Sequence, residues 1–203
     1  MIAIIDHGYA NIRSVERMLR RLNHVPLVVD NPKDIERADK IILPGIGAFD
    51  GPLQRLRQLG LHDALAEHAL VRRRPILGIC VGMQIMTRGS EEGEAEGLGW
   101  IDAECLRFHP SVESKLRVPH MGWNKVTIEP QATLFKAFGS EAKYYFVHSY
   151  YVALKDQAVN AASCSYDVNF CASFQKDNIF GVQFHPEKSH RFGLGLLKAF
   201  VDL

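Results

Sequence analysis

The chain has 203 residues, 47% of them hydrophobic, and its 24 basic and 23 acidic side chains leave a formal net charge of +1. That length supports one substantial hydrophobic core, so we expect a single domain over residues 1–203. The balanced charge argues against the strongly basic surface with which proteins bind nucleic acid or a membrane. The start of the chain lacks the basic and long apolar segments of a signal peptide, which indicates a cytoplasmic protein.

Short apolar runs alternate with helical periodicity in the first half of the chain. Residues 1–6 predict a strand, and the apolar spacing that follows Asn11 predicts a helix capped by this side chain. A helical segment over 53–71 is predicted to divide near Gly60. Further strands are predicted at 25–30, 41–43 and 75–79. Strands that alternate with helices imply a parallel sheet covered on both faces.

Beyond Gly89 the pattern becomes mostly extended. A short helix is predicted near 132–138 and a closing helix over 192–202. Extended segments are predicted at 100–108, 123–129, 143–152, 158–165, 170–176 and 179–184. The expected fold class is therefore α/β, with a mostly parallel central sheet and added β structure in the second half.

The four cysteines, at positions 80, 105, 164 and 171, show no Cys-x-x-Cys pair and no histidine spacing typical of zinc. A chain of this size needs no disulfide, so we expect free thiols. Since a free cysteine most often serves as a small buried apolar residue, a reactive one must be identified from its surroundings.

Cys80 has such surroundings. Residues 78–82 (Gly-Ile-Cys-Val-Gly) follow an apolar strand and precede a helical segment, the layout of a nucleophile elbow with cysteine in place of serine. Side chains at Gly78 and Gly82 would collide with backbone in such a turn. The start of the helix would stabilise a thiolate, and the N–H of Val81 would supply half of an oxyanion hole.

A second oxyanion donor is expected from residues 44–47 (Pro-Gly-Ile-Gly). They follow a predicted strand, so they should lie at the same carboxyl edge of the sheet as the elbow. A glycine-rich loop there can turn the peptide N–H of Ile46 or Gly47 toward the oxyanion. The loop lacks the Lys-Ser/Thr of a phosphate-binding loop, so nucleotide binding is not supported.

His185 lies just after a predicted strand, and Glu187 follows two residues later in a His-Pro-Glu segment. A thiol nucleophile needs a base, and an imidazole held in one tautomer by a carboxylate is the usual solution. His-x-Glu also begins the zinc deaminase signature, but the Pro-Cys-x-x-Cys that completes it is absent. We therefore predict a triad of Cys80, His185 and Glu187 that needs no metal or cofactor.

Two segments resemble the signatures of class I glutamine amidotransferases: Gly-Ile-Cys-Val-Gly-Met-Gln at 78–84 and Gly-Val-Gln-Phe-His-Pro-Glu-Lys-Ser at 181–189. The resemblance covers the whole chain and implies a three-layer flavodoxin-like fold and hydrolysis of L-glutamine through a cysteine thioester. Residues 118–124 (Val-Pro-His-Met-Gly-Trp-Asn) resemble the glutaminase subunits of imidazole glycerol phosphate synthases. That likeness implies a heterodimer with a (β/α)8 cyclase that uses the ammonia in histidine formation.

The resemblance also implies roles for residues that the pattern alone would assign to core or loop. The residues that would hold glutamine are Gly45, Gln84, Glu92, His148, Ser149 and Tyr150. Those that would lie at the partner interface are Asn11, His120 and Trp123. By itself Glu92 belongs to an acidic stretch over 91–96 that predicts a solvated loop, although the α-ammonium of glutamine needs such an anion.

Three alternatives stay open at this point. Residues 97–104 and 188–193 are more similar to paralogues that supply ammonia for sugar amidation in surface-polysaccharide biosynthesis. A cysteine peptidase or related hydrolase of similar fold would also use Cys and His on an elbow, although Gln84 and the His-Pro-Glu segment argue against it. A non-catalytic flavodoxin-like interaction subunit would tolerate Cys80→Ala without loss of function.

Overall fold

Five parallel strands form the centre of the computed structural model, which describes residues 1–136 and 142–203. Their order in the sheet is β2-β1-β3-β4-β13, and every neighbouring pair is parallel. The bounds are Ile2–Ile5 (β1), Leu27–Val29 (β2), Lys40–Gly45 (β3), Ile76–Cys80 (β4) and Ile179–Val182 (β13). Every residue of β1, β4 and β13 is buried, as expected of strands with helices on both faces.

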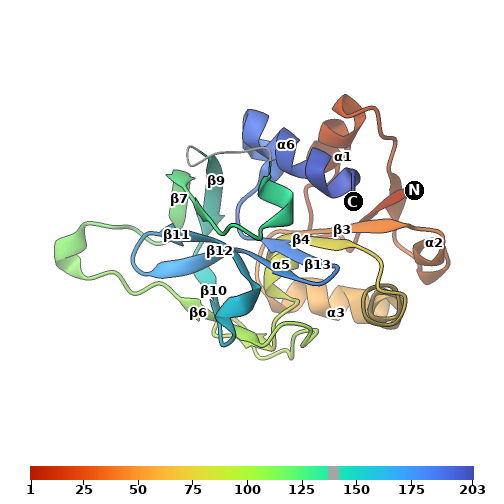
Figure 1. Cartoon of the computed structure of the whole chain (residues 1–203). Helices are drawn as coiled ribbons and strands as arrows, with labels where there is room; N and C mark the ends of the chain where they lie inside the picture. The colour runs from red at the N-terminus through yellow and green to blue at the C-terminus, as the bar shows by residue number, and fades with distance from the viewer. Residues whose placement is uncertain (137–141) are drawn as a thin grey trace.

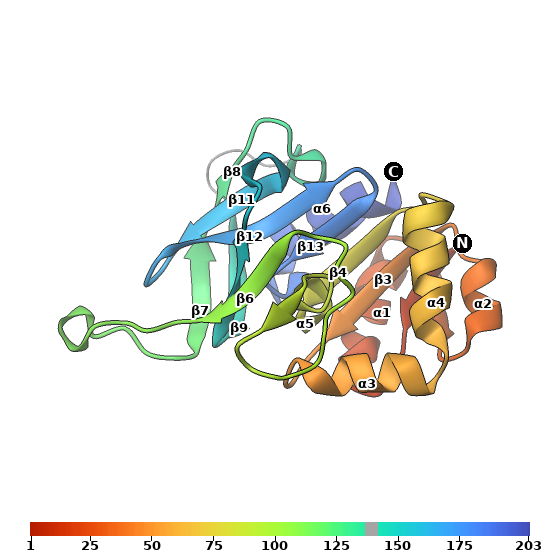
Figure 2. The ribbon, with the colours of Figure 1, turned by 90° about the horizontal axis from the view of Figure 1, so that it is seen from below.

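Helices cover the two faces of these strands and make the expected three layers. Figures 1 and 2 show α1 and α6 on one face and α3 and α4 on the other. The helices are α1 (Ile12–Arg21), α2 (Pro32–Glu36), α3 (Asp50–Gln58), α4 (Leu61–Ala66), α5 (Val81–Gln84) and α6 (His190–Val201). Gly60, with φ 68°, separates α3 from α4 as predicted, and a π-helical turn over Glu67–Val71 continues α4.

Among the described residues, the second half of the chain extends the same sheet to eleven strands, mostly by antiparallel pairing. The added strands are β5 (Gly89–Ser90), β6 (Ala103–Arg107), β8 (Thr127–Ile128), β10 (Tyr150–Leu154), β11 (Asn160–Ser165) and β12 (Asn169–Lys176). A separate antiparallel pair is formed by β7 (His120–Lys125) and β9 (Lys143–His148). The predicted α/β class with added β structure is confirmed.

Several local predictions differ from the structure. Asn11 occupies the N-cap position of α1, but its side chain makes no capping hydrogen bond. The predicted helix near 132–138 is a short 3-10 turn, Thr133–Phe135, and positions 137 and 138 lie outside the described residues. Other 3-10 turns occupy Val112–Ser114, Gln157–Val159 and Pro186–Lys188.

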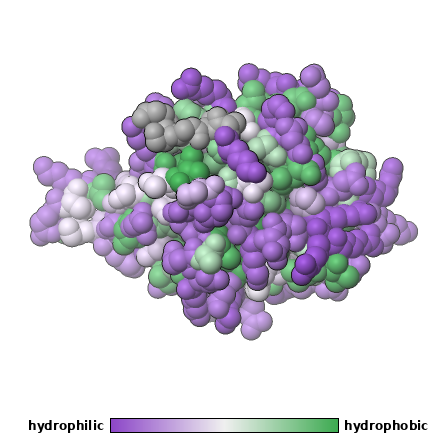
Figure 3. Space-filling view, in the orientation of Figure 1, coloured by the Kyte–Doolittle hydropathy of each residue, from purple (hydrophilic) through white to green (hydrophobic). Residues whose placement is uncertain are grey.

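The surface carries mixed polar character. Hydrophilic residues cover most of the face seen in Figure 3, with small hydrophobic groups between them. Over residues 1–136 and 142–203, no helix is both long and apolar enough to cross a membrane.

Candidate active site

Cys80 ends β4 and starts the turn into α5. Its backbone has φ 54° and ψ −113°, on the positive side of φ where a non-glycine residue is rare. Such strain persists only where the surrounding structure enforces it, and it is concentrated at functional sites. The structure thus has the sharp strand-to-helix turn that the glycine spacing predicts.

The glycines of the elbow are packed against backbone. A Cβ on Gly78 would lie 2.6 Å from the carbonyl oxygen of Gly82, and a Cβ on Gly82 would lie 1.8 Å from that of Leu43. Gly45 pairs with Cys80 across β3 and β4, and its Cβ would lie 2.6 Å from the Gly82 nitrogen. Gly45 therefore packs against the turn, and its expected contact with substrate stays a prediction.

The other three cysteines are buried free thiols. Burial raises the pKa of Cys105 and of Cys164 to about 12, and it raises the pKa of Cys171 as well. These thiols stay protonated near neutral pH and are inert, as expected of structural cysteines.

His185 and Glu187 form a buried hydrogen-bonded pair beside the elbow. His185 Nδ1 lies 2.8 Å from Glu187 Oε1, and their side chains are 4% and 2% exposed. The His185 backbone is held by its N–H donating to the Tyr145 carbonyl and its carbonyl accepting from the Ser189 hydroxyl. With Nδ1 engaged by the carboxylate, Nε2 is the imidazole atom available to a thiol.

The environment of His185 favours its protonated form. Burial lowers its pKa, but the charge and hydrogen bond of the Cys80 side chain, together with those of Glu187, raise it to about 10. An imidazolium beside the sulfur is the partner that a nucleophilic thiolate requires.

The expected oxyanion donors need one correction. The N–H of Ile46 donates to the Tyr9 carbonyl at 2.8 Å, so it is not free to bind an oxyanion. Gly47, with φ 87°, and Val81, at the first position of α5, both line the cavity that holds Cys80. Because the first N–H groups of a helix have no partner inside it, Val81 remains the primary candidate and Gly47 the second.

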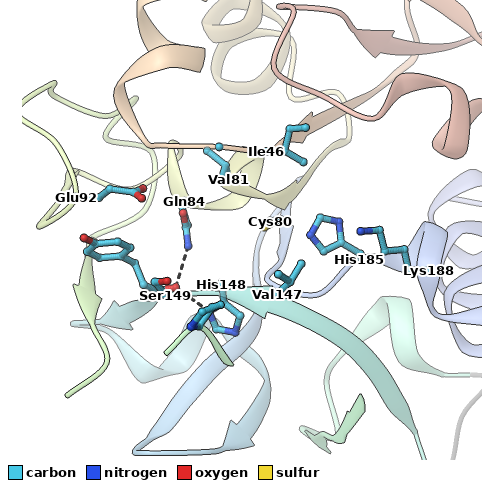
Figure 4. A pocket seen from close by; sticks show the side chains of 13 residues that line it. Ile46, Cys80, Val81, Gln84, Glu92, Val147, His148, Ser149, His185 and Lys188 are labelled. Atoms are coloured by element: carbon cyan, nitrogen blue, oxygen red, sulfur yellow. Dashed lines mark hydrogen bonds between the residues drawn. The ribbon is translucent and has the colours of Figure 1, made fainter. Parts of the chain in front are cut away.

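A cavity of about 310 Å³ opens above the elbow (Figure 4). Its lining residues are Ile46, Gly47, Cys80, Val81, Gln84, Glu92, Pro119, Val147, His148, Ser149, Tyr150, His185 and Lys188. The sequence identifies ten of these, and it misses Pro119, Val147 and Lys188. Of these three, Lys188 could have been predicted to line the cavity, since it directly follows the His-Pro-Glu segment.

Glu92 is the carboxylate on the cavity wall. Its Oε2 accepts the N–H of Phe49 at 3.0 Å, which ties the acidic loop to the start of α3. Burial raises the pKa of Glu92. In the described ranges, the cavity included, no group of three or more His, Cys, Asp or Glu side chains is arranged to hold a metal ion.

The residues expected at a partner interface fall into two classes. Trp123 is 42% exposed and stacks on the ring of His190, and Asn11 is half-buried. His120 is 3% exposed, stacks on Tyr166 with ring centroids 4.0 Å apart, and bonds His148. His120 therefore supports the interior of the β7–β9 pair, which corrects its expected place on the surface.

Because three histidines are buried in their neutral form, we expect the free energy of unfolding to fall in mild acid. Burial lowers the pKa of His68 and of His120 to about 4 and of His148 to about 3. Below pH 6.5 the unfolded chain binds protons that the folded chain does not. Each histidine then removes about 1.4 kcal/mol of unfolding free energy per pH unit, down to about pH 4. His185, with its raised pKa, is protonated in both states over this range and adds nothing to the slope.

Urea unfolding at pH 6.5, 5.5 and 4.5 checks this expectation. His68→Gln should flatten the slope by about 1.4 kcal/mol per pH unit, because it removes one of these titrations. Gln54→Ala, at an exposed position of α3 with no titratable side chain, is the control and should leave the slope unchanged. An unchanged slope in His68→Gln would contradict the assignment.

Comparison with known proteins places this geometry in a family. A family model described as glutamine amidotransferase class-I matches residues 3–202. The chain belongs to the class-I glutamine amidotransferase family. It is therefore an enzyme of the glutamine amidotransferase type, and the family resemblance noted in its sequence is confirmed.

Relatives within the glutamine amidotransferases are similar over their full length. Imidazole glycerol phosphate synthase subunit HisH 2 of Pseudomonas aeruginosa is 46% identical over 203 residues, which cover all of both chains. Subunit HisH 1 of Campylobacter jejuni is 45% identical over 204 residues, again covering all of both. PurLQS from Thermotoga maritima shares the fold at a TM-score of 0.73 and 20% identity, covering 99% of this chain and 97% of that one.

Proposed function

We propose that the chain is the glutaminase subunit of an imidazole glycerol phosphate synthase. It would act in the cytoplasm as one glutamine amidotransferase domain over residues 1–203. The observation that carries the proposal is the strained Cys80 thiol beside the buried His185–Glu187 pair in a cavity. Support for the particular synthase comes from the relatives of that name, 41–46% identical over nearly the whole chain.

L-Glutamine fits the polarity of the cavity. Its side-chain amide would meet Cys80, and its α-ammonium would meet the carboxylate of Glu92. Its carboxylate would accept hydrogen bonds from backbone N–H groups at the Ser149–Tyr150 strand junction, which lines the opposite wall. Gln84 Nε2 donates to the Tyr150 carbonyl at 3.0 Å and so fixes this wall (Figure 4).

The chemistry follows from the triad. The Cys80 thiol proton passes to His185, and the sulfur attacks the amide carbon of glutamine. The N–H groups of Val81 and Gly47 stabilise the oxyanion. As the intermediate collapses, the C–N bond breaks and His185 gives its proton to the leaving ammonia. Water, deprotonated by His185, then hydrolyses the thioester to glutamate and restores the thiol, while Glu187 keeps the imidazole oriented.

The ammonia needs a second protein. In water it would become ammonium, which is no nucleophile, so an acceptor enzyme must dock over the cavity. The proposed partner is a (β/α)8 cyclase in a heterodimer. Exposed apolar side chains suited to such docking lie on the loops and on β7: Tyr9, Ile46, Met121 and Trp123 are 42–61% exposed.

Measuring glutamate release with and without the partner tests this function. The chain alone should turn over L-glutamine slowly, and the complex with the cyclase and its ligand should be faster by at least about a hundredfold, because docking completes the site. Equal turnover in both states would contradict coupling to a cyclase.

A second acceptor is supported by the names of the relatives. Four of them, at 41–46% identity, are named HisH 1 or HisH 2, and two others at 41% identity carry no number. A numbered copy fits a paralogue that supplies ammonia for sugar amidation in surface-polysaccharide biosynthesis. Purifying the native complex separates the two functions: a barrel cyclase alone supports the histidine pathway, and a complex that includes a sugar amidotransferase supports the paralogue.

A further inference from the structure

A series of buried hydrogen bonds runs from β7 toward the nucleophile. His120 Nδ1 lies 3.0 Å from His148 Nε2, and His148 Nδ1 lies 2.7 Å from the Tyr150 carbonyl oxygen. That carbonyl also accepts the Nε2–H of Gln84 at 3.0 Å, so two hydrogen bonds meet on it (Figure 4). The side chains of these histidines and of Gln84 are all buried, so water does not replace the bonds.

The series of hydrogen bonds continues to the Cys80 sulfur through Gln183, the residue that follows β13. Gln84 Nε2 lies 3.1 Å from Gln183 Oε1, and Gln183 Nε2 lies 3.8 Å from Cys80 Sγ. Gln183 is fully buried, and its backbone N–H donates to the Ala172 carbonyl of β12. The amide of the Gln183 side chain is thus held on one side by Gln84 and on the other by the Cys80 sulfur.

The direction of each hydrogen bond is determined. A backbone carbonyl only accepts, so Gln84 must turn its amide nitrogen toward Tyr150. The same nitrogen faces Gln183, whose amide oxygen must accept and whose NH2 group must then point at Cys80. No flipped orientation of the Gln183 amide satisfies both contacts.

The donors and acceptors in the hydrogen bonds of His120 and His148 are determined as well. Burial lowers the pKa of His120 to about 4 and of His148 to about 3, so both are neutral near pH 7. His148 must donate from Nδ1 to the Tyr150 carbonyl and accept at Nε2, so His120 donates from Nδ1. Asn124 Nδ2, 3.4 Å from His120 Nε2, donates to the remaining nitrogen.

We propose that Gln183 is a catalytic residue that donates a hydrogen bond to the Cys80 sulfur and keeps the thiolate directed into the cavity. The proposal rests on the proposed role of Cys80 as nucleophile. An N–H donor stabilises a thiolate more than a neutral thiol or thioester, so it favours the sulfur both as nucleophile and as leaving group. Unlike His185, the amide exchanges no proton and remains a donor throughout the reaction.

Replacing Gln183 by Met isolates this hydrogen bond. The change is neutral to neutral, so the charged and titratable groups around Cys80 are unaltered. Those groups come from four segments: His185, Glu187 and Lys188 after β13, His148 on β9, Tyr150 on β10, and Glu92 after β5. A change in the pH dependence of Cys80 reactivity would then report the lost donor.

Alkylation of Cys80 by iodoacetamide between pH 5 and 10, followed by peptide mass spectrometry, tests the proposal without glutamine. In Gln183→Met the midpoint of the alkylation profile should rise by about one pH unit, which corresponds to a tenfold change in the equilibrium between thiol and thiolate. Gln183→Glu, which keeps an acceptor for Gln84 but puts an oxygen against the sulfur, should shift the midpoint further. The KM for glutamine should change less than kcat in both variants.

Gln175→Met is the matched control. Gln175 is a half-buried glutamine of β12 whose amide bonds Thr133, and its loss should leave the alkylation profile unchanged. A profile of Gln183→Met that superimposes on the wild type would overturn the proposal. In the wild type, the side-chain amide NMR signal of Gln183 should shift with the Cys80 midpoint, and a constant signal would also overturn it. If glutamine is not hydrolysed, the proposed function fails, while these profiles still decide the role of Gln183.

Discussion

Cys80→Ala should lower glutamate release from L-glutamine by at least about 10⁴-fold, measured in the presence of the partner, while the chain stays folded. In the proposed mechanism the Cys80 sulfur forms the bond to substrate. No other cysteine can replace it, because Cys105, Cys164 and Cys171 are buried away from the cavity with raised pKa values. Circular dichroism and urea unfolding would verify the fold.

Cys164→Ala is the control for this result. It removes a buried free thiol of β11 and should retain full activity, with only a modest loss of stability. Activity that survives in Cys80→Ala would support the non-catalytic interaction subunit, and activity lost equally in both variants would point to misfolding.

Gly82→Ala should lower the free energy of unfolding by about 3 kcal/mol or more, at the upper end of the usual cost of overpacking. The added Cβ would lie 1.8 Å from the Leu43 carbonyl oxygen, and this neighbour is backbone of a central strand that cannot turn aside. Because the clash pushes β3 away from the elbow, glutaminase activity should fall as well. Urea unfolding measures the first effect and glutamate release the second.

Gly89→Ala offers a matched comparison, since a Cβ there would meet no atom within 4 Å. Its unfolding midpoint should stay close to that of the wild type. If Gly82→Ala were as stable as Gly89→Ala, the close packing of elbow and β3 would be wrong.

The sequence predicts correctly those parts of the site whose residues lie within a few positions of one another in the chain. The elbow around Cys80 depends on glycines two residues to either side, and the His185–Glu187 contact spans two residues. The central strands could also be predicted, because a strand that helices cover on both faces consists of one continuous apolar run.

Alternation along a strand explains the error at His120. Successive side chains of β7 point to opposite faces, so His120 and Trp123, three residues apart, cannot both face a partner. The observed burial alternates accordingly, with His120 buried and Met121 and Trp123 exposed. The alternation of side chains along β7 could be predicted from the sequence. Which of its two faces is buried could not, because that depends on the aromatic residues of β9 and β12 that pack against His120.

Two contacts between distant segments could not be predicted. Ile46 loses its expected role because its N–H meets the carbonyl of Tyr9, 37 positions earlier in the chain. Gln183 reaches Cys80, 103 positions away, because β13 lies beside β4 in the sheet. Neither pairing leaves a periodic or compositional signal.

The reaction of the chain with a diazoketone analogue of L-glutamine tests the central claim most directly. Peptide mapping should find one adduct per chain, on Cys80, and excess L-glutamine should slow its formation in the wild type. His185→Ala should slow labelling at pH 7 at least about tenfold, since it removes the imidazolium that stabilises the thiolate. An adduct on another residue, or labelling of Cys80 that glutamine does not slow, would contradict a glutaminase built on Cys80, His185 and Glu187.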